Sequence, residues 1–197
     1  KGRAGWDHLF VCVDDHSRLA HCRIYPAETT ANALHFLTDC LTFYNQHGIT
    51  IEEVLTDNGK CFQRRWEQGS RHAGITPRHT RVRRPQTNGK AERFIRTLLN
   101  EWIRPHHYPT NTHRTNSLPD YLHHYNHHRP HRPLRGQTPA QRASTTSLGL
   151  TPGSACAVGS DGACLAEFLG LVERVVGPLE EVGRAVRRVE LRDAGRQ

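Results

Sequence analysis

The chain has 197 residues, a formal net charge of +8, 15 histidines and no methionine. This length predicts one domain followed by a tail. No apolar run is long enough to span a membrane and no signal-peptide pattern opens the chain, so a soluble intracellular protein is expected. The absence of methionine, even at position 1, favours a fragment of a longer product.

Charge is distributed unevenly along the chain. Residues 1–144 carry a net charge of +9 and every histidine, whereas residues 145–197 carry a net charge of −1. A basic first part suits a polyanion such as DNA, although basic surfaces also occur on proteins that bind no nucleic acid. The sequence therefore predicts two regions, a basic core over residues 1–142 and an atypical tail over residues 143–197.

Strand and helix patterns alternate through the core. The expected strands are Leu9–Asp14, Leu19–Tyr25, Ile51–Thr56 and Ile75–Thr80. The expected helices run from Thr29 or Thr30 to His47, over Gln63–Ala73, from before Glu92 to near Arg104, and over Leu118–His128. A strand, a helix and another strand in this order are typical of a crossover in an α/β sheet.

The tail has a different composition. Ser, Thr, Gly and Pro dominate from Ala143 to Gly162, as in a linker. Apolar residues from Leu165 to Val189 then recur every three or four positions, which is a heptad pattern. Pro178 lies inside that pattern and costs about 3 kcal/mol in a helix interior. A kinked helix pair or a frameshifted tail with no selected fold is therefore favoured over a coiled coil.

Asp57 and Glu92 are the acids best placed for chemistry. Asp57 follows an expected strand and precedes the turn pair Asn58-Gly59, which would set its carboxylate at the carboxyl end of a strand, where α/β proteins bind ligands. Glu92 lies one turn into a helix, behind an Arg-rich loop. Two such acids at one point can hold Mg²⁺ for phosphodiester chemistry. Taken singly, Asp57 reads as a turn residue and Glu92 as a surface acid favoured by the helix dipole.

Several motifs follow one another in a fixed order. They are Val13-Asp14-Asp15-His16-Ser17-Arg18, Leu55-Thr56-Asp57-Asn58-Gly59, Gly74-Ile75, Arg84-Pro85-Gln86-Thr87-Asn88-Gly89-Lys90-Ala91-Glu92-Arg93, and Tyr125-Asn126 with Arg129-Pro130-His131, Leu134 and Thr138-Pro139. Through them, residues 5–142 resemble the integrase core of insertion-sequence transposases. These are bacterial relatives of retroviral integrases with a DDE active site.

The resemblance implies an α/β fold of the ribonuclease H-like type, in which a mixed five-stranded sheet is flanked by helices. It also implies Mg²⁺, with Mn²⁺ as a substitute, held by two Asp and one Glu, with Asp57 matching the second acid and Glu92 the third. The implied partners are the element ends and target in double-stranded DNA and further copies of the chain, in the bacterial cytoplasm at the nucleoid. Basic residues near the two acids are the expected DNA contacts: Lys60, Arg81, Arg83, Arg84, Lys90, Arg93 and Arg96.

The family's first acid has no match in this sequence. It belongs on a strand that would lie upstream of Lys1, so the sheet is expected to lack its first, central strand and to leave the neighbouring strands unpaired. Asp14 and Asp15 are read as turn residues with Ser17 and Arg18, and Asp7 is a still weaker substitute. The chain is therefore expected to be inactive and marginally stable.

Histidine and cysteine patterns leave a zinc site as a minor alternative. His123 and His127, and likewise His124 and His128, have the i, i+4 spacing of a helical metal chelate. No third ligand recurs at a suitable spacing, and the six cysteines form no CxxC pair, so core thiols are the better interpretation. Two other functions stay open: a non-catalytic DNA-binding relic that modulates an intact transposase, and a ribonuclease H proper.

Overall fold

The computed structural model describes residues 7–80, 89–147, 164–169 and 174–175. Its strands are β1 (Asp7–Asp14), β2 (Ala20–Tyr25), β3 (Ile51–Thr56), β4 (Thr76–His79), β5 (Cys164–Leu169) and β6 (Arg174–Val175). Its α-helices are α1 (Thr30–Gln46), α2 (Arg64–His72), α3 (Gly89–Leu98), α4 (Asn111–His123) and α5 (Pro139–Ser147). Short 3₁₀ turns lie at η1 (Lys60–Phe62) and η5 (Arg132–Leu134), and π-helical turns at η3 (Leu99–Ile103) and η4 (His124–His128).

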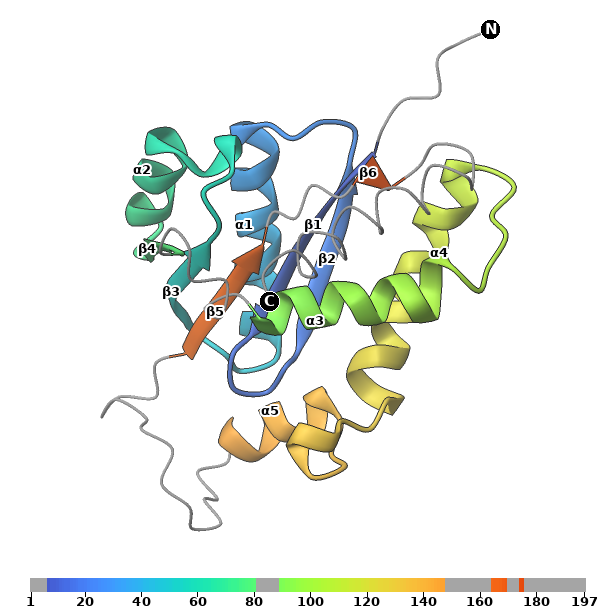
Figure 1. Ribbon diagram of the computed structural model, residues 1–197. Helices are drawn as coiled ribbons and strands as arrows, with labels where there is room; N and C mark the ends of the chain where they lie inside the picture. The colour runs from blue at the N-terminus through green and yellow to red at the C-terminus, as the bar shows by residue number, and fades with distance from the viewer. Residues whose placement is uncertain (1–6, 81–88, 148–163, 170–173, 176–197) are drawn as a thin grey trace, which may run out of the picture.

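All the strands belong to one mixed sheet with the order β2-β1-β5-β3-β4, and β6 pairs with the start of β1. β1 is antiparallel to β2 and β5, whereas β3 is parallel to β5 and β4. Figure 1 shows the strands side by side, with α1 and α2 on one side and α3 crossing the other.

The β1–β2 hairpin forms where the sequence predicts it. The buried run of β1 turns at Asp14, whose backbone carbonyl accepts from Arg18 N at 3.0 Å. Arg18 takes a left-handed φ of 65°, and Asp14 N donates to Leu19 O at 2.9 Å to begin the return strand. The expected turn is confirmed, and it brings β2 into a full antiparallel register with β1.

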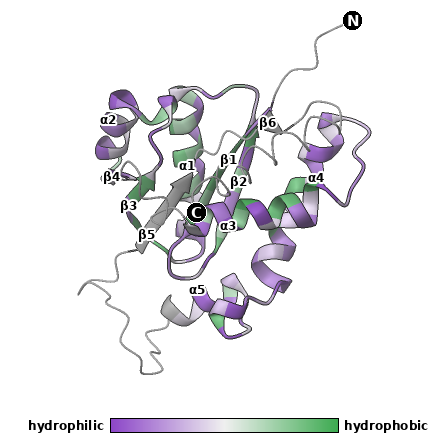
Figure 2. Ribbon diagram, viewed as in Figure 1, coloured by the Kyte–Doolittle hydropathy of each residue, from purple (hydrophilic) through white to green (hydrophobic). Residues whose placement is uncertain are grey.

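Alternation along β1 sends apolar side chains to both faces of the sheet. Phe10 and Cys12 face the core shared with α1, η1 and α2. Val11 and Val13 face the second core, which contains α3, η3 and α4. Because both faces of the central strands are covered, β1 reads as a nearly continuous apolar run rather than an alternating one. In Figure 2 the hydrophobic residues gather on the strands and the inner helix surfaces, and α2 and α4 are largely hydrophilic.

α1 begins and packs as its sequence predicts. Thr29 caps it, with Oγ1 accepting from Asn32 N at 3.2 Å. Its buried residues are Ala33, Phe36, Leu37, Cys40 and Tyr44. The Tyr44 hydroxyl lies 3.1 Å from Cys12 O and 2.9 Å from Leu19 O, so it ties the helix to the turn end of the hairpin.

The helix expected over Leu118–His128 begins seven residues earlier, at Asn111, and ends in the π-helical turn η4. Its cap is Thr110, which accepts from His113 N at 3.2 Å. Asn126 lies in η4 and is buried against β2. Its side-chain amide accepts from Ala20 N at 2.9 Å and donates to Ala20 O at 2.8 Å, so Asn126 satisfies the outer edge of β2 in the way another strand would.

Helix α5 was not predicted, because Pro139–Ser147 falls where the Ser- and Thr-rich linker composition begins. A sequence signal for it exists. Thr138 and Gln141 form a reciprocal capping box: Thr138 N donates to Gln141 Oε1 at 2.9 Å and Gln141 N donates to Thr138 Oγ1 at 3.3 Å. Pro139 follows the cap, at the first helical position, where proline is tolerated.

The tail also differs from expectation. Residues 164–169, which open the heptad pattern, form strand β5 and not a helix. This strand lies between β1 and β3, so the unpaired seam expected there is filled. In a short apolar segment, a spacing of three to four residues does not distinguish a helix from a strand. Here the segment forms a strand because it pairs with the edges of β1 and β3. The rest of the expected heptad, apart from Arg174–Val175, lies outside the described residues.

Candidate active site

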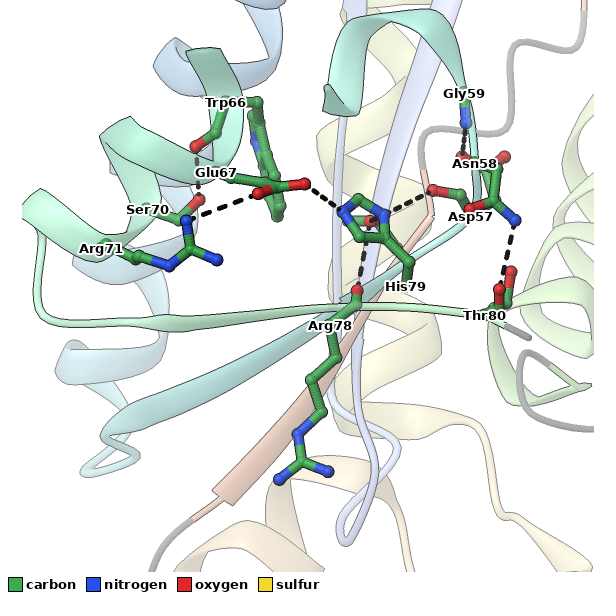
Figure 3. A network of polar contacts seen from close by, with 11 residues as sticks. Asp57, Asn58, Gly59, Trp66, Glu67, Ser70, Arg71, Arg78, His79 and Thr80 are labelled. Carbon is green, nitrogen blue, oxygen red and sulfur yellow. Dashed lines mark hydrogen bonds and ion pairs between the residues drawn. The ribbon is translucent and has the colours of Figure 1, made fainter. Parts of the chain in front are cut away.

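Asp57 stands directly after β3, at the carboxyl end of the strand, as the sequence predicts. Its side chain is half-buried and turns back on its own loop, where Oδ1 accepts from Gly59 N at 2.9 Å (Figure 3). A Cβ on Gly59 would lie 2.9 Å from Asp57 Oδ1 and 3.6 Å from Glu28 Oε1. Glycine at position 59 therefore leaves room for two carboxylates to approach the same loop.

The electrostatic environment of Asp57 favours a cation. Burial is the main cause that raises the pKa of Asp57, and the charge of Glu28 raises it further. The Gly59 amide and His79 act in the opposite direction and lower this pKa. A divalent ion at the carboxylate would offset the desolvation and the repulsion by Glu28 together.

Glu28 is a site residue that the sequence analysis missed. It lies between β2 and α1, and its Oε1 accepts from Cys61 Sγ at 3.5 Å. Burial, and then the charge of Glu28, raise the pKa of the Cys61 thiol to about 12, so this thiol stays protonated at neutral pH. An acid just before a helix is common as a partner of the helix dipole, and only the folded chain brings Glu28 to the loop after β3.

His79 on β4 lies beside the Asp57 backbone and contacts it (Figure 3). Its Nδ1 lies 3.0 Å from Thr56 Oγ1 and 3.3 Å from Asp57 O. Its Nε2 lies 2.9 Å from Glu67 Oε1 on α2, and this bond to His79 is the main cause that lowers the pKa of Glu67. The imidazole thus joins the end of β3 to α2. No sequence motif predicts this role of His79.

The loop after β3 is held on its other side by Asn58. The Asn58 side-chain amide donates to Thr80 O at 3.2 Å, and Thr80 N donates to Thr56 O at 2.8 Å. Parallel pairing between β3 and β4 thus continues past the end of the strands. Asp57 is fixed from both sides at its backbone.

Glu92 lies in the first turn of α3 and is exposed. The same helix buries Ala91, Phe94, Ile95 and Leu98 against the sheet, as the sequence predicts. Arg93 and Arg96 are exposed on α3 as well. The helix therefore presents one acid and two cations on its outward surface.

The other expected DNA contacts have different surroundings. Lys60 is exposed in η1, two residues beyond Asn58. Lys90 forms an ion pair with Asp15, so its charge is shared with the β1–β2 turn. Arg81, Arg83 and Arg84 lie outside the described residues.

The three acids considered as substitutes for a first site acid have structural contacts. Asp14 is buried, and its Oδ2 accepts from Ser17 N at 2.7 Å and from the Ser17 hydroxyl. Asp15 pairs with Arg18 at 3.8 Å. The turn interpretation of this pair is confirmed. Asp7 forms a 2.7 Å ion pair with the buried Arg114.

A multi-histidine zinc site has no support in the described part of the chain. No group of three or more His, Cys, Asp or Glu residues there could hold a metal ion. His123 and His128 do meet, with their Nε2 atoms 3.3 Å apart, because the π-helical turn brings residues five apart together. The cysteines described at positions 12, 22, 40 and 61 are buried free thiols, as expected.

Magnesium needs fewer protein ligands than zinc. Mg²⁺ usually keeps several waters and is bound through one or two carboxylates together with substrate phosphates. The Asp57 carboxylate, with its raised pKa and with Glu28 nearby, has the donor chemistry and the local negative charge for such an ion. The residues present therefore fit a hydrated divalent cation.

Two models of the integrase core domain match this chain, one over residues 1–85 and the other over residues 73–139. Together they cover the region in which the motifs occur. The chain belongs to the integrase core family. The resemblance carried by the motifs around Asp57 and Glu92 is thereby confirmed at the level of the family.

Curated relatives of this integrase core include viral and bacterial proteins. A putative integrase from Spiroplasma virus SpV1-C74 is 28% identical over 155 residues, which cover 72% of this chain and 43% of the relative. The InsD transposase of insertion element IS2D from Escherichia coli is 34% identical over 90 residues, which cover 45% of this chain and 30% of the relative. The chain thus spans less than half the length of either relative.

Solved structures confirm the ribonuclease H-like fold. The catalytic core domain of BIV integrase is 25% identical, with a TM-score of 0.53 over 68% of this chain and 82% of the other. A chain in the structure of the simian T-cell lymphotropic virus intasome in complex with PP2A regulatory subunit B56 gamma is 21% identical, with a TM-score of 0.60 over 78% of this chain and 54% of the other. Among the described residues, no helix is both long and apolar enough to cross a membrane.

Proposed function

We propose that this integrase core serves DNA transposition, with Asp57 and Glu92 as the acids that hold Mg²⁺ at the reacting phosphodiester. The observation that carries the proposal is the half-buried Asp57 carboxylate at the carboxyl end of β3, whose pKa is raised by burial and by Glu28. A carboxylate in this environment gains more from a bound cation than an exposed one does.

The chain's own residues would act mainly by positioning. His79 and Asn58 hold the backbone on either side of Asp57, and the Gly59 amide donates to its carboxylate. Glu92 would reach the same ion from α3, a separate element anchored by a buried apolar face. Mg²⁺, when bound, would polarise the phosphodiester and generate the attacking oxygen. The HTLV-2 integrase core, solved in complex with magnesium, shares this fold at 20% identity and a TM-score of 0.51.

DNA would be held by the exposed cations beside these acids. Arg93 and Arg96 extend from the same helix as Glu92, and Lys60 follows Asp57 by three residues. Contacts of this kind bind the phosphate backbone, position the DNA and carry little sequence information. Binding should weaken steeply with salt, since each neutralised phosphate releases counterions.

The test measures binding of a short DNA duplex by the full chain in Mn²⁺, which substitutes for Mg²⁺. Mn²⁺ should strengthen DNA binding by the wild type. Asp57→Asn or Glu92→Gln should reduce this Mn²⁺-dependent increase in DNA affinity about tenfold or more. Glu52→Gln, an exposed change on β3, the strand that Asp57 follows, is the matched control and should keep the gain. Equal metal dependence in all four proteins would overturn the proposal.

Catalysis by this chain alone is a separate part of the proposal. We infer that strand transfer is very weak, because two carboxylates bind the metal loosely and place it poorly. A strand-transfer assay in Mn²⁺ should give no product above the Asp57→Asn background. Product formed by the wild type and abolished by Asp57→Asn and Glu92→Gln would make this chain an active transposase and contradict the inference.

A non-catalytic DNA-binding role is the second candidate. It is favoured by one observation, that the described residues bring no three potential metal ligands together. DNA binding that depends on salt but not on Mn²⁺, Asp57 or Glu92 would support it. Arg93→Glu should then weaken binding, whereas Arg65→Glu, an exposed change on α2 at the other face of the sheet, should not.

A further inference from the structure

Strand β5 comes from the tail yet occupies the middle of the sheet. It pairs antiparallel with β1, where Cys12 faces Phe168 and Val13 faces Glu167 in the register. On its other edge it pairs parallel with β3, where Val54 faces Ala166 and Leu55 faces Glu167. Figure 1 shows β5 in orange between the blue β1 and the teal β3, strands that come from the opposite end of the chain.

Both edges that β5 satisfies belong to strands buried in the core. Val11, Val13 and Val54 are at most 1% exposed. A backbone edge in such surroundings has no water to replace a lost partner, and unpaired buried N–H and C=O groups are costly. The position between β1 and β3 therefore requires an extended segment, antiparallel to the first and parallel to the second.

The connection to β5 is long enough to reach this position. α5 ends at Ser147 and β5 begins at Cys164. An extended chain of this length spans on the order of 50 Å, more than the width of a small domain. The connection is therefore long enough to bring the tail strand between β1 and β3.

The same strand connects the two elements that carry the candidate acids. β5 pairs with β3, which ends at Asp57, and it also contacts α3, which carries Glu92. An empty or differently filled position would change both the spacing of β1 and β3 and the support under α3. Seating of the tail strand and the geometry of the site are thus mechanically linked.

We propose that the space between β1 and β3 is a strand-docking site, that the chain's own Cys164–Leu169 segment is its occupant, and that docking positions Asp57 relative to Glu92. The segment acts as an intramolecular ligand of the core. The part that concerns Asp57 and Glu92 rests on the proposed metal function, whereas the docking itself does not.

Docking is tested first by a cysteine cross-link in the full chain. Directly opposed residues on antiparallel strands have Cα atoms about 4.5–5.5 Å apart, within the range that a disulfide spans. Phe168→Cys should therefore form a disulfide with the native Cys12 under mild oxidation, identified by peptide mass spectrometry without reduction. Leu165→Cys, which opposes Glu53 on the other edge, is the matched control and should give no link to Cys12.

The pattern of links decides the occupant. A disulfide within one chain between Cys12 and the thiol introduced by Phe168→Cys supports the proposal. Absence of that link, or equal yields from the two variants, overturns it. A link found only between two chains, detected by mixing isotopically labelled and unlabelled protein, would make a second copy the occupant and would likewise contradict it.

Positioning of the acids is tested with Ala166→Pro, which removes a backbone N–H at the position facing Val54 and Asp14. Amides of β1 and β3 should exchange with solvent faster, and Mn²⁺ should bind at least fivefold more weakly. The cross-linked Phe168→Cys protein, in which the strand stays seated, should retain wild-type Mn²⁺ affinity, and a loss of affinity there would contradict the positioning role.

The two proposals fail in distinguishable ways. A wild type that binds no Mn²⁺ would refute the proposed metal function, while the cross-link would still decide the docking. A specific cross-link together with unchanged Mn²⁺ affinity in Ala166→Pro would refute the positioning role and leave the docked strand in place.

Discussion

His79 Nδ1 lies 3.3 Å from the backbone carbonyl oxygen of Asp57, the residue that carries the candidate site. The same imidazole reaches Glu67 on α2 through Nε2, at 2.9 Å. One side chain therefore couples the loop after β3 to a helix on the face opposite α3. We regard His79 as a positioning residue, since it touches the backbone of Asp57 and not its carboxylate.

Replacing His79 should affect the site more than the fold. His79→Ala should lower Mn²⁺ affinity several-fold and lower the free energy of unfolding by about 1 kcal/mol, the typical worth of a lost hydrogen bond. His72→Ala, an exposed histidine at the end of α2, is the control and should change neither quantity. Unchanged Mn²⁺ affinity in His79→Ala, measured by isothermal titration, would remove His79 from the site.

Gly59 offers a purely steric test of the Asp57 loop. Its φ of −60° suits any residue, so Gly59→Ala brings no backbone strain, but the new Cβ would lie 2.9 Å from Asp57 Oδ1. The displaced carboxylate should bind Mn²⁺ about tenfold more weakly or worse, as misplacement of a metal ligand does. Gly89→Ala meets no atom within 4 Å and is the matched control. Equal affinities in the two variants would contradict the crowding at Gly59.

Asn126 should be among the polar residues that matter most for stability. Its amide pairs with both backbone groups of Ala20 on the outer edge of β2, and both residues are buried. Asn126→Ala would leave those groups without partners, at about 2–3 kcal/mol of unfolding free energy. Asn116→Ala, an exposed change on α4, should cost little. Urea denaturation distinguishes the two, and a cost below about 1 kcal/mol for Asn126→Ala would contradict the edge-closing role.

Stability should fall in mild acid because of His21. Burial lowers the pKa of His21 from 6.5 to about 4, so the unfolded chain takes up a proton at this residue between those values and the folded chain does not. The free energy of unfolding therefore decreases as pH falls from about 6.5 to about 4. His21 accounts for a decrease on the order of 2 kcal/mol, after allowance for its partial exposure.

The pH effect can be assigned by substitution. His21 stacks on Phe43 at 4.6 Å between ring centroids, and His21→Phe keeps an aromatic ring while removing the titration. This variant should lose less stability between pH 7 and pH 5 than the wild type. His72→Phe, at an exposed position, should retain the full wild-type dependence, and identical pH profiles for His21→Phe and the wild type would contradict the assignment.

Much of the fold could be predicted because local signals and tertiary packing agree. β3 has the predicted bounds, Ile51–Thr56, and α1 is capped by Thr29, one of the two predicted caps. Strand β5 could not be predicted, since its apolar residues also fit a helical period and its place depends on two edges more than 100 residues away. The capping box at Thr138 shows that α5 did have a readable local signal.

The residues of the candidate site likewise include some that the sequence predicts and some that it does not. Asp57 could be found because an acid beside a turn pair, after an apolar strand, is a local pattern. Glu28 and His79 could not, because their roles arise only when the β2–α1 connection and β4 are brought to the end of β3. The exposed position of Glu92 follows from the apolar spacing of α3 and was predictable.

The proposed metal function requires that Asp57 and Glu92 bind the same metal ion. A double-mutant cycle on Mn²⁺ affinity, with Asp57→Asn, Glu92→Gln and the combined variant, tests it directly. If the acids share an ion, each single change should weaken binding about tenfold or more, and the combined change should weaken it by clearly less than the product of the two. Losses that multiply, or no loss in one single variant, would show that the two carboxylates do not form one site.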